Sequence, residues 1–473
     1  MKSLSDVLGA LLVSVALVVL GAIPLFIGQE KIFYLTVGAF IVLAFTLSRN
    51  ARLFILVAFL PLASVQIIRG IGLYRLYDLL FVILFIEGIL LVDLFRWRRI
   101  PVLGWPAAMF IAFLPSLVNV EQLGISLAAL LQFAIVTLTA AGVYYYLVES
   151  KHDRLIFYLS AFFVIEAAVT GAIGILQALR SSLFVKFVSG RVYFAPFGDA
   201  NYYATYLLTA FAIGIALVFI QRTLTGRLLL SGSVGVIAVA IIATLSRSGW
   251  LTFVLIVLLY AIYFFVSQKG SRKIIGFAVL ASVVAIIGLV VFTNIGGRLV
   301  DLMNLSTRAE RALTGKDTSF EQRRKIIEVT WRAIKSNPIV GVGFGNFERV
   351  FNSYRGSLLS TESSRSVHNT PLRIFAETGI VGLIPSLLFV WFLFTYLWKA
   401  HSAVETFDAK VFLFGLIVAL ASFLMMSMTL DQLAGNEFWV ITGIALAAST
   451  KALQGRSILG RGVGSASITS IST

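Results

Sequence analysis

The sequence contains no cysteine, which excludes disulfide bonds, thiolate metal sites and a cysteine nucleophile. Charged residues are also scarce: they make up 13% of the 473 positions, whereas a soluble protein carries about 25%. Hydrophobic residues account for 59% of the chain. A water-soluble fold cannot hide that much apolar surface, so we expect lipid to be the solvent for most of the protein.

The few charges that are present are mostly positive, and the formal net charge is +16. In a soluble domain this balance would suggest nucleic acid as a partner. In a membrane protein, however, Lys and Arg gather in cytoplasmic loops and hold the topology. No basic tract has a pattern typical of RNA or DNA binding, so we predict a lipid bilayer as the surrounding partner and no nucleic acid.

Apolar runs long enough to cross roughly 30 Å of hydrocarbon occur about fourteen times. Each should be an α-helix, because backbone polar groups must be satisfied within the bilayer. The predicted fold is therefore an all-α polytopic integral membrane protein with about 14 transmembrane helices. The runs lie near 7–27, 32–48, 53–69, 77–95, 102–118, 123–148, 155–178, 202–220, 229–246, 249–266, 274–295, 372–397, 411–430 and 437–451.

These spans divide the chain into four parts. Residues 1–295 form a bundle of about 11 spans, and the first of them is expected to be a retained helix rather than a signal peptide. Residues 296–370 form one large external loop that contains short helices. Residues 371–452 add about three further spans. Residues 453–473 form a low-complexity cytoplasmic tail that we expect to be disordered.

The connections between spans predict the orientation. The loop RWRRIP, with Arg96, Arg98 and Arg99, is expected in the cytoplasm, and the sides then alternate so that both termini are cytoplasmic. Arg69 and Arg75 fall outside against this pattern. We therefore predict a multi-pass membrane protein. Its external segments are 180–201, 246–249, 296–370 and 431–437.

The chain has three histidines, and the topology separates them. His152 and His401 fall in cytoplasmic loops beside basic residues, where we expect them to be solvated. His368 alone is external, just before a helix start at Asn369-Thr370-Pro371. Its distance from the other histidines argues against a metal site. Because an unperturbed imidazole has a pKa near 6.5, His368 is a candidate general base; the alternative is a hydrogen-bonded histidine at the interface.

External arginines accompany this histidine. Arg247 lies in the short turn between two apolar runs, and Arg191 lies in an aromatic-rich external segment. A guanidinium reads phosphate in a bidentate manner, so both suggest an anionic phosphate group at the outer leaflet. The alternative for Arg247 is a snorkelling residue that marks a helix end. Arg323, Arg324 and Arg373 are further candidates, with surface charge as their alternative role.

Other patterns in the chain carry weaker predictions. No Asp-x-Asp pair in a suitable place and no Walker A sequence are present, which argues against a metal-dependent nucleotide-sugar transferase. Glu87 and Glu166 fall inside predicted helices, where we expect each to pair with a polar neighbour. In the long loop we predict a surface helix that ends at Asn337-Pro338. Its residues Ile327, Trp331 and Ile334 should share one face, which would lie on the membrane.

At these residues the chain resembles the O-antigen ligase / O-antigen polymerase family of bacterial envelope enzymes. The resemblance covers about 194–447, roughly half the chain. It rests on the order of several short motifs and on the large external loop before the last helices. The motifs are FGDAN at 197–201, LSRSG at 245–249, the W…NP…GVG run between 331 and 343, and HNTP…ETG between 368 and 379.

The resemblance implies transfer of a glycan from undecaprenyl diphosphate to an acceptor hydroxyl on the outer face, without metal, nucleotide or other cofactor. It implies that His368 is the base for the acceptor hydroxyl and that Arg191 and Arg247 hold the diphosphate. Asn201 and Asn369 lie in the same motifs and are candidates for supporting the site. In-line attack at the anomeric carbon would invert its configuration.

The acceptor is left open by the sequence. We favour an O-antigen or surface-polysaccharide polymerase, on helix count, with a chain-length regulator as a further partner. The alternatives are a ligase that caps lipid A core and a protein O-oligosaccharyltransferase. A polytopic transporter is the rival from another class, but its usual internal repeats and broken helices are not evident.

Overall fold

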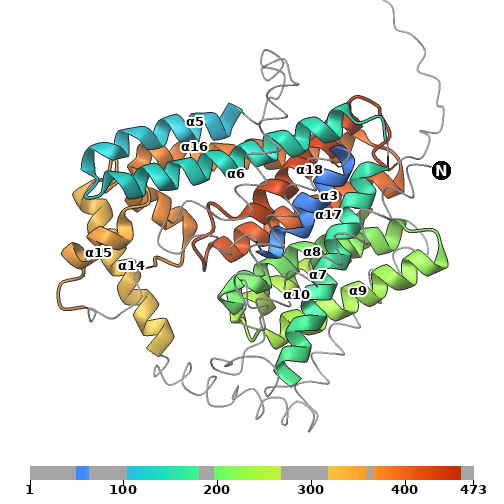
Figure 1. The fold of residues 1–473 in the computed structure, drawn as a ribbon, viewed down its shortest axis with the longest axis horizontal. Helices are drawn as coiled ribbons and strands as arrows, with labels where there is room; N and C mark the ends of the chain where they lie inside the picture. The colour runs from blue at the N-terminus through green and yellow to red at the C-terminus, as the bar shows by residue number, and fades with distance from the viewer. Residues whose placement is uncertain are drawn as a thin grey trace, which may run out of the picture.

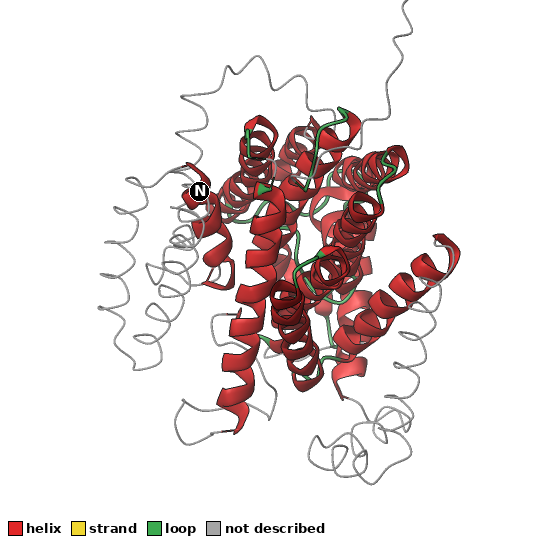
Figure 2. Ribbon diagram, turned by 90° about the vertical axis from the view of Figure 1, so that its right-hand side faces the viewer, coloured by secondary structure: helices red, strands yellow, loops and turns green. Residues whose placement is uncertain are grey.

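The computed structural model describes residues 49–62, 104–152, 154–179, 197–267, 318–358 and 366–459. Every regular element in these residues is a helix (Figures 1 and 2). The α-helices of this part are α3 (Arg49–Ala58), α5 (Gly104–Phe113), α6 (Leu123–Glu149), α7 (Leu155–Leu179), α8 (Ala200–Ile220), α9 (Leu224–Ala243), α10 (Arg247–Ser267), α14 (Thr318–Ser336), α15 (Phe347–Arg355), α16 (Thr370–Ala403), α17 (Phe407–Ser427) and α18 (Asn436–Leu453).

Seven of the described helices are long and apolar enough to cross a membrane: α6, α7, α8, α9, α10, α16 and α17. Each matches a span predicted from the sequence. The run predicted at 102–118 is instead the short α5 followed by a 3-10 turn, and α18 occupies the last predicted span. The spans predicted at 7–27, 32–48, 77–95 and 274–295 lie outside the described residues. The all-α membrane fold is thus confirmed, and the count of fourteen stays a prediction.

The centre of the bundle is formed by α8 and α17, which pack along each other. Glycine permits this closeness at one point, since a Cβ on Gly415 would lie 2.5 Å from the Cβ of Ala216. Around this pair, α18 packs on α6, α7 and α9 pack together, and α16 packs on α5. Of the two carboxyls predicted to pair with a polar neighbour, Glu166 of α7 accepts a hydrogen bond from the Tyr206 hydroxyl of α8. The other, Glu87, lies outside the described residues.

The two ends of the bundle have different contacts. At one end, Arg222 pairs with Asp408 at 3.2 Å. At the other end, the Gln432 amide donates to the Thr205 hydroxyl, which joins the α17–α18 connection to α8. The short helices α14 and α15, from the predicted external loop, contact α16 at this second end (Figure 1). The structure therefore gathers the starts of α8, α16 and α18 at the end that carries α14 and α15.

A kink in α16 is built jointly with the glycine-rich segment 338–345. Gly379 has φ of 62°, in the left-handed region. There the Ile380 and Val381 amides donate to the carbonyls of Pro338 and Ile339, at 2.9 and 3.2 Å. A Cβ on Gly379 would lie 2.1 Å from the Ile339 oxygen, so only glycine fits.

The helix α14 ends at Ser336, directly before Asn337-Pro338, as expected. Its predicted apolar face is divided, however. Ile334 is only 3% exposed, because it belongs to a small core shared with α15 and α16, whereas Ile327 and Trp331 are 39% and 45% exposed. The prediction that all three share a lipid-facing side is wrong for Ile334.

Replacing Gly379 by alanine should destabilise the fold by about 3 kcal/mol or more, because the new Cβ meets backbone and φ is positive. The measurement is the thermal unfolding midpoint of the detergent-solubilised protein. Gly232→Ala is the control, since a Cβ there meets nothing within 4 Å. Equal midpoints for the two variants would contradict the proposed role of the kink.

Candidate functional site

His368 lies in a short link between two anchored points. On one side Val367 is 2% exposed, within the core of α14 and α15. On the other side Asn369 caps α16, since its Oδ1 accepts from the Leu372 amide at 2.9 Å. His368 itself has φ of 54°, which is uncommon for a residue other than glycine. Its backbone is therefore held in a specific, strained turn directly before the helix.

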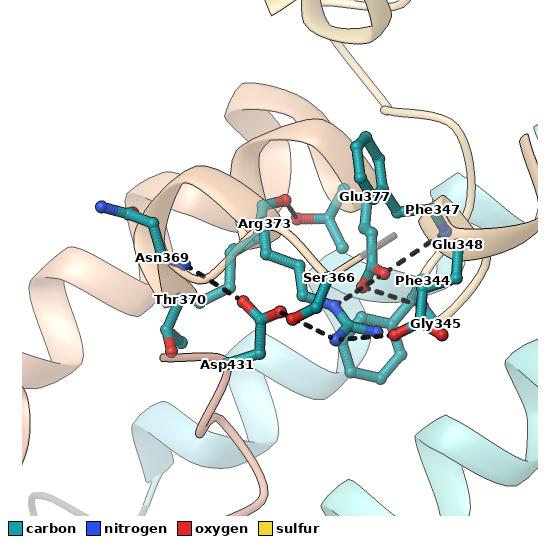
Figure 3. Close-up of polar contacts among 12 residues, drawn as sticks. Phe344, Gly345, Phe347, Glu348, Ser366, Asn369, Thr370, Arg373, Glu377 and Asp431 are labelled. Carbon is teal, nitrogen blue, oxygen red and sulfur yellow. Dashed lines mark hydrogen bonds and ion pairs between the residues drawn. The ribbon is translucent and has the colours of Figure 1, made fainter. Parts of the chain in front are cut away.

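Asp431, in the connection between α17 and α18, holds this turn in place. Its Oδ2 accepts hydrogen bonds from the Ser366 hydroxyl and from the His368 amide, the latter at 3.2 Å. Its Oδ1 accepts from the Asn369 amide, also at 3.2 Å. Figure 3 shows Asp431 facing Ser366, Asn369 and Arg373. One buried carboxylate therefore fixes the segment that carries the histidine.

Arg373 joins Asp431 to two glutamates. Its Nε donates to Glu377 Oε1 at 3.0 Å, one turn along α16. Its Nη1 lies 3.5 Å from Asp431 Oδ2 and 3.7 Å from Glu348 Oε1. The Glu377 and Asp431 side chains are 3% and 5% exposed. Arg373 is therefore not a surface charge, and its guanidinium is already engaged by protein carboxylates (Figure 3).

Glu377 also accepts hydrogen bonds from the glycine-rich segment and from the start of α15. Its Oε2 accepts from the Gly345 amide at 2.9 Å, and its Oε1 accepts from the Phe347 amide at 3.4 Å. The Glu377 backbone carbonyl accepts from Gly343 at 2.9 Å. This carboxylate thus binds the start of α15 to α16 and stands in the same ion cluster as Asp431.

A cavity of about 440 Å³ opens beside the ion cluster. Its wall is polar on the side of α16 and the α17–α18 connection and aromatic on the side of α6 and α8. The lining residues are Leu60, Ala129, Gln132, Phe133, Phe197, Tyr202, Phe344, Gly345, Thr370, Arg373, Ile374, Glu377, Asp431, Gln432, Leu433, Ala434, Gly435, Asn436 and Glu437.

A smaller apolar groove of about 140 Å³ lies between α5, α16, α17 and α18. It is lined almost wholly by apolar side chains such as Met109, Leu387 and Phe423. Thr370, Ile374, Gln432 and Leu433 line both the groove and the larger cavity. A polar site and an apolar site therefore share one wall.

The environment of His368 favours a neutral imidazole. Burial lowers its pKa below the ordinary value of 6.5, and the positive charge of Arg323 lowers the pKa further. Asp431, Asp199 and Glu348 act in the opposite direction but do not outweigh the burial. Nδ1 is buried and has no hydrogen-bond partner among the described residues. A neutral ring with a free nitrogen can accept a proton.

Arg247 is the first residue of α10 and is exposed. It lies at the same end of the bundle as the cavity, because a Cβ on Gly249 would be 3.2 Å from Ala204 in the second turn of α8. Arg247 does not line the cavity. The second predicted phosphate-binding arginine, Arg191, lies outside the described residues.

The remaining predicted residues have separate roles. Arg324 pairs with Glu321 at 3.2 Å and is 68% exposed, so it is a surface charge. Asn201 follows the α8 cap, where its amide donates to Asp199 Oδ1 at 2.7 Å. His152 is exposed, as expected. His401 is not solvated: it is 8% exposed, within α16, and hydrogen-bonds the Tyr263 hydroxyl at 3.1 Å, because α10 and α17 cover it.

Several site residues were missed by the sequence reading. Asp431 and Glu437 were placed only within an external turn, and Gln432 was not considered. Glu377 stands four residues after Arg373, a spacing that places two side chains on one helix face and could have suggested the ion pair. Across the described ranges, no three His, Asp or Glu side chains come together as a metal site.

Comparison with known proteins supports part of this region. A family model described as O-antigen ligase matches residues 232–387. The chain is also 31% identical to the O-antigen ligase of Salmonella typhimurium (strain LT2) over 155 residues, which are 32% of this chain and 35% of that protein. The chain thus matches about a third of the length of that relative. The family match includes Arg247, His368, Arg373 and Glu377 but ends before Asp431.

Removing the Asp431 carboxylate should cost about 3 kcal/mol of folding free energy, because it leaves the His368 and Asn369 amides without their acceptor and removes one of the carboxylates that pair with Arg373. Asp431→Ala should therefore lower the thermal unfolding midpoint of the solubilised protein. Glu348→Gln is the matched control, because Glu348 is 51% exposed and lies farther from Arg373. An Asp431→Ala midpoint as high as that of the control would refute the anchoring role.

Proposed function

We propose that this chain, which matches the O-antigen ligase family model over residues 232–387, transfers a glycan from undecaprenyl diphosphate to an acceptor hydroxyl. His368 is the base in this proposal. The observation that carries it is the His368 ring, whose Nδ1 has no partner among the described residues and whose backbone amide donates to Asp431, a residue of the cavity wall. A base needs a neutral ring that is held in a fixed position.

The two adjoining sites fit a substrate with a lipid tail and a sugar head. The larger cavity offers polar and aromatic groups, and the groove that shares its wall offers only apolar contact over most of its length. A lipid-linked glycan likewise joins a polar sugar part to an apolar lipid part. The arrangement therefore supports a lipid-linked substrate over a free sugar.

The chemical step follows from these groups. The acceptor hydroxyl gives its proton to His368 while its oxygen forms a bond to the anomeric carbon of the donor. The bond from that carbon to the diphosphate breaks, and the diphosphate leaves with an added negative charge. Arg247, with Arg191, stabilises that charge. Attack from the face opposite the leaving group inverts the anomeric carbon, and no metal or cofactor takes part.

The orientation belongs to the same proposal. We place the protein in the bacterial cytoplasmic membrane with the cavity end facing the periplasm or exterior and both termini in the cytoplasm. The basic loops expected in the cytoplasm support this, because Arg222 and Arg227 lie at the end opposite the cavity. A reporter fusion in the 359–365 segment that reads cytoplasmic would reverse the assignment.

Three acceptors belong to the proposal: another lipid-linked glycan, lipid A core and a protein hydroxyl. The number of apolar runs favoured a polymerase, which extends another lipid-linked glycan. The ligase activity, transfer to lipid A core, is favoured by the description of both the family model and the Salmonella relative. Reconstitution with a purified lipid-linked glycan separates these two activities: a polymerase lengthens the chain on the lipid, and a ligase acts only when the core acceptor is added.

His368→Gln should reduce the transfer rate by about 100-fold or more, as loss of a general base does. His152→Gln is the control, because it removes an exposed histidine at the opposite end. The measurement is glycan transfer by protein reconstituted in vesicles, with equal folded amounts of each variant. Transfer by His368→Gln at the wild-type rate would remove His368 from the mechanism.

Arg247→Ala should lower the transfer rate by about 100-fold, the usual loss when one group that stabilises a developing negative charge is removed. Arg324→Ala, at the exposed pair with Glu321, should stay within about two-fold of the wild-type rate. The same reconstituted assay measures both. Similar losses of transfer rate in the two variants would mean that any positive charge on this surface supports transfer, and that Arg247 has no specific role.

A further inference from the structure

The larger cavity contains hydrogen-bond acceptors that the protein does not use. Gln432 is 4% exposed, and its Oε1 has no partner among the described residues. Its amide orientation follows from its neighbours: the Thr205 hydroxyl donates to the Asn201 carbonyl at 3.0 Å, so it must accept from Gln432 Nε2, also at 3.0 Å. The Gln432 oxygen is therefore left as a buried acceptor in the cavity wall.

The first turn of α18 adds two more acceptors. Asn436 is 6% exposed, and its Oδ1 likewise has no partner in the described part of the chain. The half-buried Glu437 lines the cavity next to it. A buried polar atom without a partner is costly. Both residues belong to the lining of the larger cavity, where a ligand with hydrogen-bond donors would complete the site.

The charge of the lining selects among such ligands. Arg373 is the one basic residue among those that line the cavity, against Glu377, Asp431 and Glu437. The lining is therefore net negative whether or not Glu437 is ionised. The guanidinium is also already held by Glu377 and Asp431. A diphosphate or a carboxylate placed here would meet repulsion and would lack a free cation.

The aromatic wall completes the description. Phe133 and Phe344 stand at 6.2 Å between ring centroids, and Phe197 and Tyr202 also line the cavity. The volume of about 440 Å³ lies at the lower end of the roughly 300–1,000 Å³ of small-molecule sites. Sugar rings present hydroxyl donors at their edges and C–H groups on their faces. In this cavity the acceptors complement the hydroxyl donors, and the aromatic rings complement the C–H faces.

We propose that this cavity binds a sugar unit of the glycan through Gln432, Asn436 and Glu437, and that it selects neutral or amino sugars against sugars that carry an acidic group. The inference rests on the proposed function and deepens it. It also separates the substrate into two places. The sugar lies in the cavity, and the diphosphate lies outside it, toward Arg247.

The test measures sugar binding apart from transfer. Full-length protein in lipid nanodiscs is titrated with the methyl glycosides of glucose, glucosamine and glucuronic acid, followed by ligand-observed NMR. Glucose and glucosamine glycosides should bind, and the glucuronide should bind about ten-fold more weakly, because its added negative charge meets a net negative lining. Inorganic pyrophosphate should not compete with the glucose glycoside.

Two variants locate the binding. Gln432→Met removes the free oxygen at similar volume and should weaken glucose binding about ten-fold, as loss of a buried hydrogen bond does. Glu437→Gln keeps the shape and should bring the glucuronide at least about three-fold closer to glucose, because one like charge is gone. Gln454→Met, at the opposite end of α18, is the control. The unfolding midpoint shows that each variant is folded, and the Glu437→Gln arm stands if Gln432→Met does not fold.

The outcomes separate the two proposals. Binding that is absent for all three glycosides, equal for the glucuronide and glucose, or displaced by pyrophosphate overturns the sugar assignment. Binding as predicted without any transfer in reconstituted vesicles leaves the cavity assignment intact and overturns the proposed function. Transfer that occurs while Glu437→Gln leaves the preference unchanged overturns the charge selection alone.

Discussion

The carboxylate of Asp431 joins three parts of the molecule that are far apart in sequence. It accepts hydrogen bonds from the Ser366 hydroxyl and from the His368 and Asn369 amides, and it lies 3.5 Å from Arg373. The backbone of the candidate base, the start of α16 and the connection before α18 are thereby fixed to one another. The strained φ of His368 can persist because this carboxylate and the buried Val367 hold both sides of the residue.

The charged residues at this end of the bundle have different roles. Arg373 neutralises part of a carboxylate cluster and is not available to a ligand, so the cluster is a support for the site. The free acceptors of the cavity then suit hydroxyl groups, and Arg247 stands outside that lining. Separate places for sugar and diphosphate would let one site recognise a neutral glycan and another stabilise the departing charge. The apolar groove beside them suits a lipid tail.

The sequence could predict the spans, because lipid imposes a length and composition on each helix that can be read locally. It could also single out His368, as the one histidine expected on the external side, and Arg247, as an arginine between two apolar runs. It could not predict Asp431 as the anchor, because its partners lie some sixty residues away and only packing brings them together. The need for glycine at position 379 could not be predicted for the same reason, because it comes from the Ile339 carbonyl, which lies on another segment. His401 was misplaced because loop boundaries cannot reveal that α16 continues to Ala403.

The central claim is that His368 acts as a neutral base in a buried position near Arg323. The most direct measurement is the pH dependence of the transfer rate in the wild type and in Arg323→Gln. Burial and Arg323 both lower the His368 pKa, so the rate should fall only as the pH drops below 6.5. Loss of the arginine charge should move this fall to higher pH. A wild-type rate that already halves at or above pH 6.5, or a profile that does not move in the variant, would contradict the account.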